Sequence, residues 1–243
     1  MSGHSKWSTI KRQKGANDAK RGLAFTKLAN AITMAVRQGG GITDPNGNFR
    51  LRLAIDAARA INMPKDTIER AIQRGNAKDA SSMVDVVYEG FGPGGFSVMI
   101  EAITDNKQRT TPEIKTLFDK NGGTMGVPGS VSYQFSQKGQ ITVGKDDLSL
   151  DDIFMVAADA GAEDIEELGE EVVIYTTPDK LHKVRTVLEA AGMKILTSEI
   201  VSSPIVSKIL SESEGQRAID FLEKLEDHND VQKVYANFEI AST

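Results

Sequence analysis

The spacing of apolar residues changes near residue 80, and this change limits the possible folds more than any other feature of the chain. Before it, apolar residues recur every three or four positions, which predicts amphipathic helices over about 16–38, 48–62 and 64–75. After it, β-branched residues alternate with polar ones, which predicts strands separated by glycine-rich turns. We therefore expect an α+β chain that begins with a three-helix bundle.

The part after residue 80 predicts two small sheets. Val84–Phe91 and Phe96–Thr104 form an expected hairpin, and a helix near 213–227 with a strand over 231–240 is expected to return to the same sheet. The intervening segment then becomes an insertion with its own sheet. The predicted fold is α+β multidomain, with an N-terminal three-helix bundle followed by two ferredoxin-like domains, one inserted in the other. The predicted domains are 1–78, 79–131 plus 206–243, and 132–205.

Two short sequences within this part resemble each other. Thr110-Thr111-Pro112-Glu113 and Thr176-Thr177-Pro178-Asp179 both follow an expected strand, and each is predicted to open a helix with its second threonine, Thr111 or Thr177, as the cap. The similarity indicates either two related units or the same capping chemistry used twice. Between them, Val131–Phe135 and Gln140–Val143 are predicted to form a hairpin.

Charge divides the chain in the same place as the periodicity. Residues 1–78 hold 15 lysines and arginines against 5 acidic residues, whereas residues 79–243 hold 14 against 29. The net formal charge of −5 thus conceals a basic module of +10 joined to an acidic body of −15. Such a module attracts polyanions, while the acidic body repels them.

Several classes of protein are disfavoured by composition. The chain has no cysteine, which excludes disulfides, thiolate metal sites and cysteine nucleophiles. No apolar run approaches the roughly 20 residues that a membrane helix needs, so no membrane partner is expected. The N-terminus lacks the apolar core of a secretory signal, which favours a cytoplasmic protein; a mitochondrial presequence is the weaker alternative. A monomer is the favoured oligomeric state.

No pattern in the chain indicates catalysis. The three histidines, His4, His182 and His228, are far apart in sequence and fit surface positions better than a metal site or a triad. The glycine-rich stretch 90–95 lacks the Lys-Ser/Thr ending of a phosphate loop and fits a hairpin turn. The acidic residues of 163–171 fit solvated strand edges better than a divalent-cation site. We expect no catalytic residues, no metal and no cofactor.

The basic module carries the candidate binding site. Lysines and arginines concentrated on one small helical domain are typical of phosphate-backbone binding. Trp7 could stack on a base, or it could pack the N-terminal arm onto the bundle. No recognition helix is evident, so base-specific readout is not predicted. The candidate nucleic-acid-binding residues are His4, Lys6, Trp7, Lys11, Arg12, Lys14, Lys20, Arg21, Lys27, Arg37, Arg52 and Arg59.

Eight short motifs are spread along the chain: Gly3-His4-Ser5-Lys6-Trp7, Ala19-Lys20-Arg21-Gly22, Arg50-Leu51-Arg52, Asn62-Met63-Pro64-Lys65-Asp66, Gly92-Pro93-Gly94-Gly95, Thr104-Asp105-Asn106, Gly129-Ser130-Val131 and Tyr235-Ala236-Asn237-Phe238. Together the first seven resemble the YebC/PmpR family, and the C-terminal one resembles it more loosely. Phe49, Thr67 and Lys107-Gln108 depart from residues common in the family and leave the basic residues undisturbed.

The resemblance implies a bacterial cytoplasmic protein with a helical N-terminal domain and two α+β domains. It implies one of two functions: a DNA-binding transcriptional regulator, or a translation factor that contacts ribosomal RNA on the ribosome, as the related mitochondrial translational activator of a cytochrome oxidase subunit does. The sequence leans modestly away from promoter readout, because a long duplex would repel the acidic body. A compact RNA cleft could accept the basic arm alone.

Overall fold

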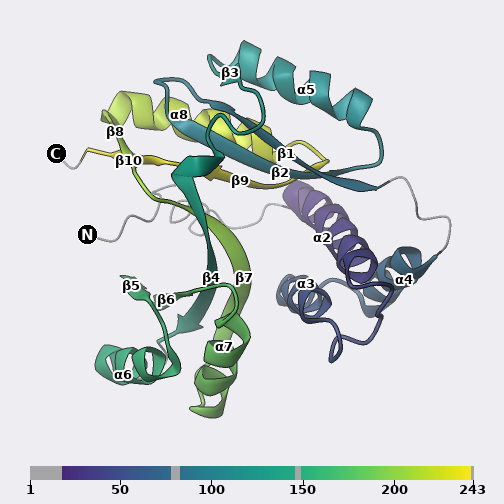
Figure 1. Cartoon of the computed structure of the whole chain (residues 1–243), viewed down its shortest axis with the longest axis vertical. Helices are drawn as coiled ribbons and strands as arrows, with labels where there is room; N and C mark the ends of the chain where they lie inside the picture. Colours follow the sequence, from purple (N-terminus) through teal and green to yellow (C-terminus); the bar gives the residue numbers. More distant parts are fainter. Residues whose placement is uncertain (1–17, 78–82, 146–148, 242–243) are drawn as a thin grey trace.

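The computed structural model describes residues 18–77, 83–145 and 149–241. They form a helical bundle beside two four-stranded sheets, each covered by two helices (Figure 1). This arrangement confirms the predicted α+β fold class. No helix within the described ranges is long and apolar enough to cross a membrane.

Three helices make the bundle: α2 (Asp18–Gln38), α3 (Phe49–Ala60) and α4 (Lys65–Asn76). Helix α3 begins where the Asn48 side chain accepts a hydrogen bond from the Leu51 amide at 3.1 Å, which satisfies one free donor of the first turn. The apolar stripe of each helix faces the others, as the periodicity predicts. The fully buried part of this core includes Ile32, Val36, Leu51 and Ala58.

The first sheet has the strand order β3-β1-β2-β9, with every neighbouring pair antiparallel. The pairing of β9 with β2 confirms that the end of the chain returns to the sheet begun at residue 84. Helices α5 and α8 cover one face, where the rings of Phe96, Phe118, Phe221 and Phe238 pack together. The elements are β1 (Val84–Phe91), β2 (Ser97–Thr104), α5 (Lys107–Lys120), β3 (Thr124–Met125), α8 (Glu212–Glu226) and β9 (Val231–Ala236).

The second sheet has the order β5-β6-β4-β7 and is built from one continuous βαββαβ segment, the ferredoxin-like arrangement. The first sheet also has four strands, but its first two strands along the chain, β1 and β2, are joined directly as a hairpin. We call the second sheet with its helices α6 and α7 the inserted unit. Its elements are β4 (Phe135–Gly144), α6 (Leu150–Ala160), β5 (Asp164–Leu168), β6 (Glu171–Thr176), α7 (Leu181–Ala190) and β7 (Ile195–Pro204). The predicted domain boundaries stay a prediction, because strand pairing alone does not show which segments fold independently.

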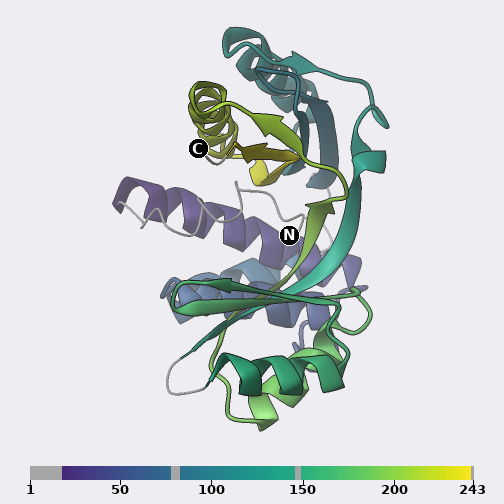
Figure 2. The ribbon, with the colours of Figure 1, turned by 90° about the vertical axis from the view of Figure 1, so that its left-hand side faces the viewer.

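Two long strands, β4 and β7, connect the sheets as a twisted ribbon (Figure 2). At its upper end Phe135 and Val131 pack against Met99 and Tyr235 on the face of the first sheet that α5 and α8 leave open. Lys233 of β9 strengthens this joint, with its Nζ 2.7 Å from a Glu199 carboxylate oxygen of β7. The two units are therefore held together by packing as well as by the chain.

Both predicted threonine-capped helix starts are wrong. Helix α5 begins after Asn106, whose side chain accepts the Arg109 amide at 3.1 Å, so Pro112 lies inside the helix. Helix α7 begins only at Leu181, three residues beyond Pro178. Helix α5 follows the inner strand β2 and precedes the edge strand β3, and α7 likewise follows the inner strand β6 and precedes the edge strand β7. The two similar sequences therefore occupy corresponding places in their sheets, and since neither threonine caps its helix, shared capping chemistry does not account for their similarity.

The predicted hairpin over residues 131–143 is also wrong. A short 3-10 turn (Ser132–Gln134) leads into the single strand β4, which pairs on both sides. Gly139 marks a close approach rather than a turn: a Cβ there would lie 2.7 Å from the Thr176 hydroxyl and 2.9 Å from the Leu181 Cβ.

The last predicted strand is interrupted at Asn237. Its side-chain oxygen accepts the Ser97 amide at 2.6 Å, and its backbone carbonyl accepts the Lys208 amide. The chain then continues as β10 (Phe238–Ile240), which pairs in parallel with β8 (Lys208–Leu210).

Candidate nucleic-acid interface

The basic helices hold their positions through close packing of α2 against α4. Gly75 allows this contact, because a Cβ at that position would lie 2.6 Å from the Thr33 carbonyl oxygen. The Thr33 hydroxyl is fully buried and bonds to the Ala71 carbonyl at 3.0 Å. The exposed side chains of the two helices are thus presented on a fixed surface.

Half of the predicted site residues fall outside the described ranges. The six residues of the N-terminal arm do so, and Lys20 lies in α2 near its beginning. The arm residues are His4, Lys6, Trp7, Lys11, Arg12 and Lys14.

Two predicted residues are open to solvent on the bundle. Arg21 is exposed and its guanidinium lies 5.5 Å from the centre of the Phe25 ring, a cation–π distance. The side chain of Arg59 is 72% exposed, and its ion pair with Asp56 spans 3.9 Å. Both guanidinium groups can therefore reach a phosphate.

Three other predicted residues are engaged by backbone carbonyls. Lys27 donates to the carbonyl of Glu226, at the electronegative C-terminal end of α8. Arg37 donates to the Met83 carbonyl at 2.6 Å, just before β1, and Arg52 to the Pro45 carbonyl at 3.1 Å. The first two contacts join the bundle to the first sheet, and the third holds the loop between α2 and α3.

Three basic residues of α4 were not among the site residues predicted from the sequence. Arg70 and Arg74 stand one turn apart on the exposed side of α4, and Lys65 is 87% exposed at its start. Arg74 reaches across to α2, where its Nη2 donates to Asn30 at 2.8 Å. Their i, i+4 spacing in the amphipathic pattern of residues 65–76 was the available signal.

The basic excess does not depend on the arm. Between residues 18 and 77 the chain holds 10 lysines and arginines against 5 acidic residues. Among the described residues, no group of three or more histidine, aspartate or glutamate side chains could hold a metal ion. The excess of cations favours electrostatic attraction of an anion.

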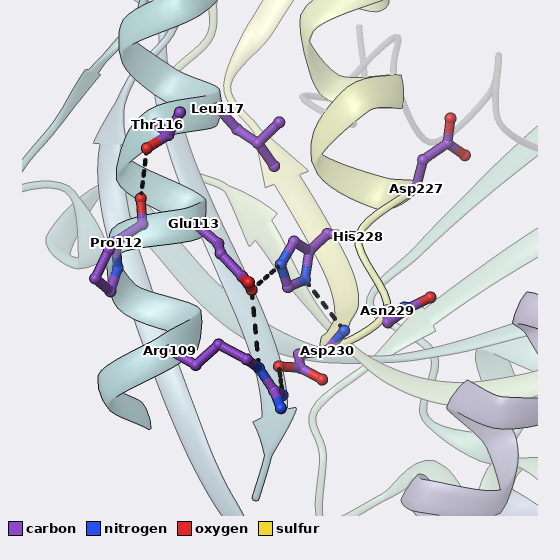
Figure 3. Close-up of a pocket in the computed structure, with 9 residues that line it drawn as sticks. All are labelled: Arg109, Pro112, Glu113, Thr116, Leu117, Asp227, His228, Asn229 and Asp230. Atoms are coloured by element: carbon purple, nitrogen blue, oxygen red, sulfur yellow. Dashed lines mark hydrogen bonds and ion pairs between the residues drawn. The ribbon is translucent and has the colours of Figure 1, made fainter. Parts of the chain in front are cut away.

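A groove of about 770 Å³ lies in the acidic part of the chain, between α5 and the turn from α8 to β9. Figure 3 shows Arg109, Glu113, His228 and Asp230 pointing toward one another, whereas Asp227 points away from them. The groove is lined by Arg109, Pro112, Glu113, Thr116, Leu117, Asp227, His228, Asn229 and Asp230.

Arg109, Glu113, His228 and Asp230 of this groove pair with one another. Arg109 lies 2.8 Å from Asp230 and 3.1 Å from Asp105. The Nδ1 of His228 accepts the Asp230 amide at 3.2 Å, so its proton is on Nε2, which donates to Glu113 at 3.0 Å. Both imidazole nitrogens are occupied, which leaves no free base.

Asp230 stays ionised at the centre of this network. Burial would raise the pKa of Asp230, but hydrogen bonds from Thr110 and Arg109 outweigh it and hold the pKa below its ordinary value. Three acidic side chains against one arginine make the groove unfavourable for a phosphate. The bundle is therefore the better candidate for an anionic partner.

Comparison with known proteins decides the family. The TACO1/YebC N-terminal domain model matches residues 5–78, and the model of the second and third TACO1/YebC domains matches residues 83–238. This chain belongs to the TACO1/YebC family. A probable transcriptional regulatory protein of Syntrophus aciditrophicus is 49% identical over 242 residues, covering 99% of this chain and 96% of the relative.

Other TACO1/YebC relatives cover the chain equally well. A probable transcriptional regulatory protein of Geobacter sulfurreducens is 46% identical over 243 residues, covering 100% of this chain and 97% of the relative. The crystal structure of a conserved hypothetical protein from Aquifex aeolicus is 41% identical, with a TM-score of 0.89 over 98% of both chains. The arrangement of the helical bundle and the two sheets is thus that of a solved structure.

Proposed function

We propose that this protein is a non-enzymatic, nucleic-acid-binding regulator of gene expression that holds a phosphate backbone with its basic N-terminal module. The observation that carries the proposal is the charge division, +10 in residues 1–78 against −15 in the remainder. A solvated surface without a polyanionic partner would mix the two signs. The names of the relatives from Syntrophus and Geobacter support a regulatory role.

The proposed contact surface combines the arm with the exposed cations of the bundle. Arg21 at the beginning of α2, Arg59 at the end of α3, and Arg70 and Arg74 along α4 can each approach a phosphate. Lys27, Arg37 and Arg52 serve mainly to orient the bundle, since backbone carbonyls occupy them. The surface reads backbone rather than sequence, because phosphate contacts fix position and carry no base information.

Binding of the full chain to a fluorescent DNA duplex and to an RNA hairpin, measured by anisotropy at increasing salt, tests the proposal. The affinity is expected to fall steeply with salt. Replacing Lys11, Arg12 and Lys14 by alanine is expected to weaken binding and to reduce the salt slope by about two to three. The double change Arg70→Ala/Arg74→Ala is expected to act in the same direction.

A matched control removes charge elsewhere. Lys115 and Lys120 are exposed cations of α5, outside the basic module, and their replacement by alanine should leave affinity and slope unchanged. Salt-independent binding, or equal loss in the control, would contradict the proposal.

Duplex DNA is the first candidate target, because the relatives are named as probable transcriptional regulatory proteins. Ribosomal RNA is the second candidate. The acidic body is the argument for RNA, because a compact RNA surface can receive the basic module while the acidic body points away. Sedimentation of cell extracts after DNase treatment separates them. A translation factor is expected to travel with ribosomal particles, whereas a transcription factor stays at the top of the gradient and protects a defined duplex from nuclease.

A further inference from the structure

The outer face of α6 combines exposed apolar side chains with exposed acids. Phe154 is 54% exposed and Met155 is 65% exposed, while Leu150, one turn before Phe154, is 37% exposed. Isolated apolar residues on a surface are ordinary, but a phenylalanine, a methionine and a leucine adjacent on one short helix form a patch. Ile153, Ala157 and Ala160 already fill the side of α6 that faces the core.

The charge around this patch has one sign. Residues 149–171 contain nine aspartates and glutamates and no lysine or arginine. Asp151 and Asp159 lie on the exposed side of α6 beside Met155, and Asp152 bonds only to the Ser149 cap of its own helix. No described cation lies within ion-pair distance of these three aspartates, although Lys145 pairs with Glu167 nearby.

The position of α6 leaves this face free of the other described helices and strands. The bundle meets the inserted unit through α3 and α7, where the Phe49 and His182 rings lie 5.1 Å apart. Figure 1 shows α6 on the side of α7 that is turned away from α3. The nucleic acid proposed for the bundle would therefore not cover it.

We propose that the α6 face, formed by Leu150, Phe154 and Met155 with Asp151, Asp152 and Asp159, is a docking surface for a lysine- or arginine-rich protein segment that carries apolar side chains. Charge complementarity selects the partner, because the surrounding acids repel nucleic acid and acidic proteins and attract cations. The apolar patch supplies anchoring contacts, to which aromatic and methionine side chains are well suited. A long basic side chain also covers apolar surface with its methylene groups, so one segment can satisfy both features.

The test uses the full chain and a fluorescein-labelled amphipathic peptide made of leucine and lysine, with an all-lysine peptide of equal charge as the comparison. The amphipathic peptide is expected to bind, and more tightly than the all-lysine peptide. Phe154→Ala/Met155→Ala and Asp151→Asn/Asp159→Asn are each expected to weaken its binding at least about tenfold. Because all four side chains are exposed, thermal melting should show that both variants fold.

Matched controls change the same chemistry elsewhere. Ile209→Ala removes an equally exposed apolar side chain from β8, and Asp119→Asn/Glu212→Gln removes two exposed acids from α5 and α8. Neither control should change the affinity. Absent binding, or equal weakening in the controls, would overturn the proposal.

Two further results would assign the face to a different occupant and so overturn it. Tighter peptide binding after Lys11→Ala/Arg12→Ala/Lys14→Ala would show that the chain's own basic arm competes for the face. A dimer in sedimentation equilibrium that dissociates in Phe154→Ala/Met155→Ala would show that a second copy covers it.

Discussion

The Asp56 carboxylate lies 2.7 Å from the Arg185 guanidinium and links α3 of the bundle to α7 of the inserted unit. Arg185 is nearly buried there, with 15% of its side chain exposed, and it also pairs with Glu189 of its own helix. Burial would lower the pKa of Arg185, but Glu189 and Asp56 raise it above its ordinary value. The orientation of the bundle thus depends on a charged contact beside the tilted pair of the Phe49 and His182 rings.

A double-mutant cycle should detect this link. Asp56→Ala and Arg185→Ala are expected to show a coupling free energy of about 1 kcal/mol, because the pair is only partly shielded from water. Urea unfolding of the wild type, both single variants and the double variant measures it. Arg59 offers the control, since it faces the same carboxylate at 3.9 Å while 72% exposed. An equally large coupling between Asp56 and Arg59 would contradict the assignment.

Glu89 should make stability depend on pH in the acidic range. Its buried carboxylate accepts amide hydrogen bonds from Gly129, Val131 and Ser132 at 2.7, 2.7 and 2.9 Å. Burial would raise the pKa of Glu89, but these donors together lower it below the ordinary 4.5. The carboxylate therefore fixes the loop that leads into the inserted unit, and it does so in its charged form.

Glu89→Gln is expected to cost about 1–2 kcal/mol of unfolding free energy at neutral pH, because a neutral amide is the weaker acceptor. A lowered folded-state pKa gives stability that is present above 4.5 and is lost as the pH falls through the folded value. The difference between wild type and variant should therefore shrink below pH 4.5. Denaturation series at several pH values measure this, with Glu212→Gln, at an exposed position of α8, as the control. A difference that grows on acidification would refute the argument.

Lys233 should hold the joint between the sheets up to alkaline pH. Burial opposes its charge, but Glu199 and neighbouring groups outweigh burial and raise the pKa of Lys233 above 10.5. A raised pKa gives stability that is present below 10.5 and is lost only as the pH rises through the folded value. Lys233→Met should therefore reduce hydrogen-exchange protection in β7 and β9 equally at pH values below 10.5. Lys233→Arg should retain part of the protection; protection unchanged in Lys233→Met would show that packing alone holds the joint.

Replacing two glycines of the bundle by alanine should change the free energy of unfolding in opposite directions. A Cβ on Gly75 would lie 2.6 Å from the Thr33 carbonyl oxygen and 2.8 Å from the Val36 Cβ, so Gly75→Ala is expected to destabilise by about 1–3 kcal/mol. At Gly22, within α2, no atom of the described residues lies within 4 Å of an added Cβ, and Gly22→Ala is expected to stabilise by up to about 1 kcal/mol. Thermal and urea unfolding measure both. A stabilising Gly75→Ala would show that α2 and α4 are not packed this closely.

The helix and strand order of this protein could be predicted locally, and its helix starts only in part. Ser149 and Ser211 cap α6 and α8 through their own side chains. At α5, however, two capping sequences compete, and Asn106 is the one used. Thr111 is instead placed with its hydroxyl 3.0 Å from that of Tyr88, a residue of β1. Which residue caps α5 therefore depends on how this helix packs against the first sheet.

The sequence by itself determined the change from helical to strand periodicity near residue 80 and the opposite charges of the two parts, because both are properties of neighbouring residues. Only the tertiary structure decided how individual charged residues are used. Lys27 and Arg37 of α2 bind backbone carbonyls more than 40 residues away in sequence, whereas Arg70 and Arg74 of α4 remain on the surface. The physical reason is that a lysine or arginine has the same charge everywhere, while its partners depend on which segments packing brings beside it.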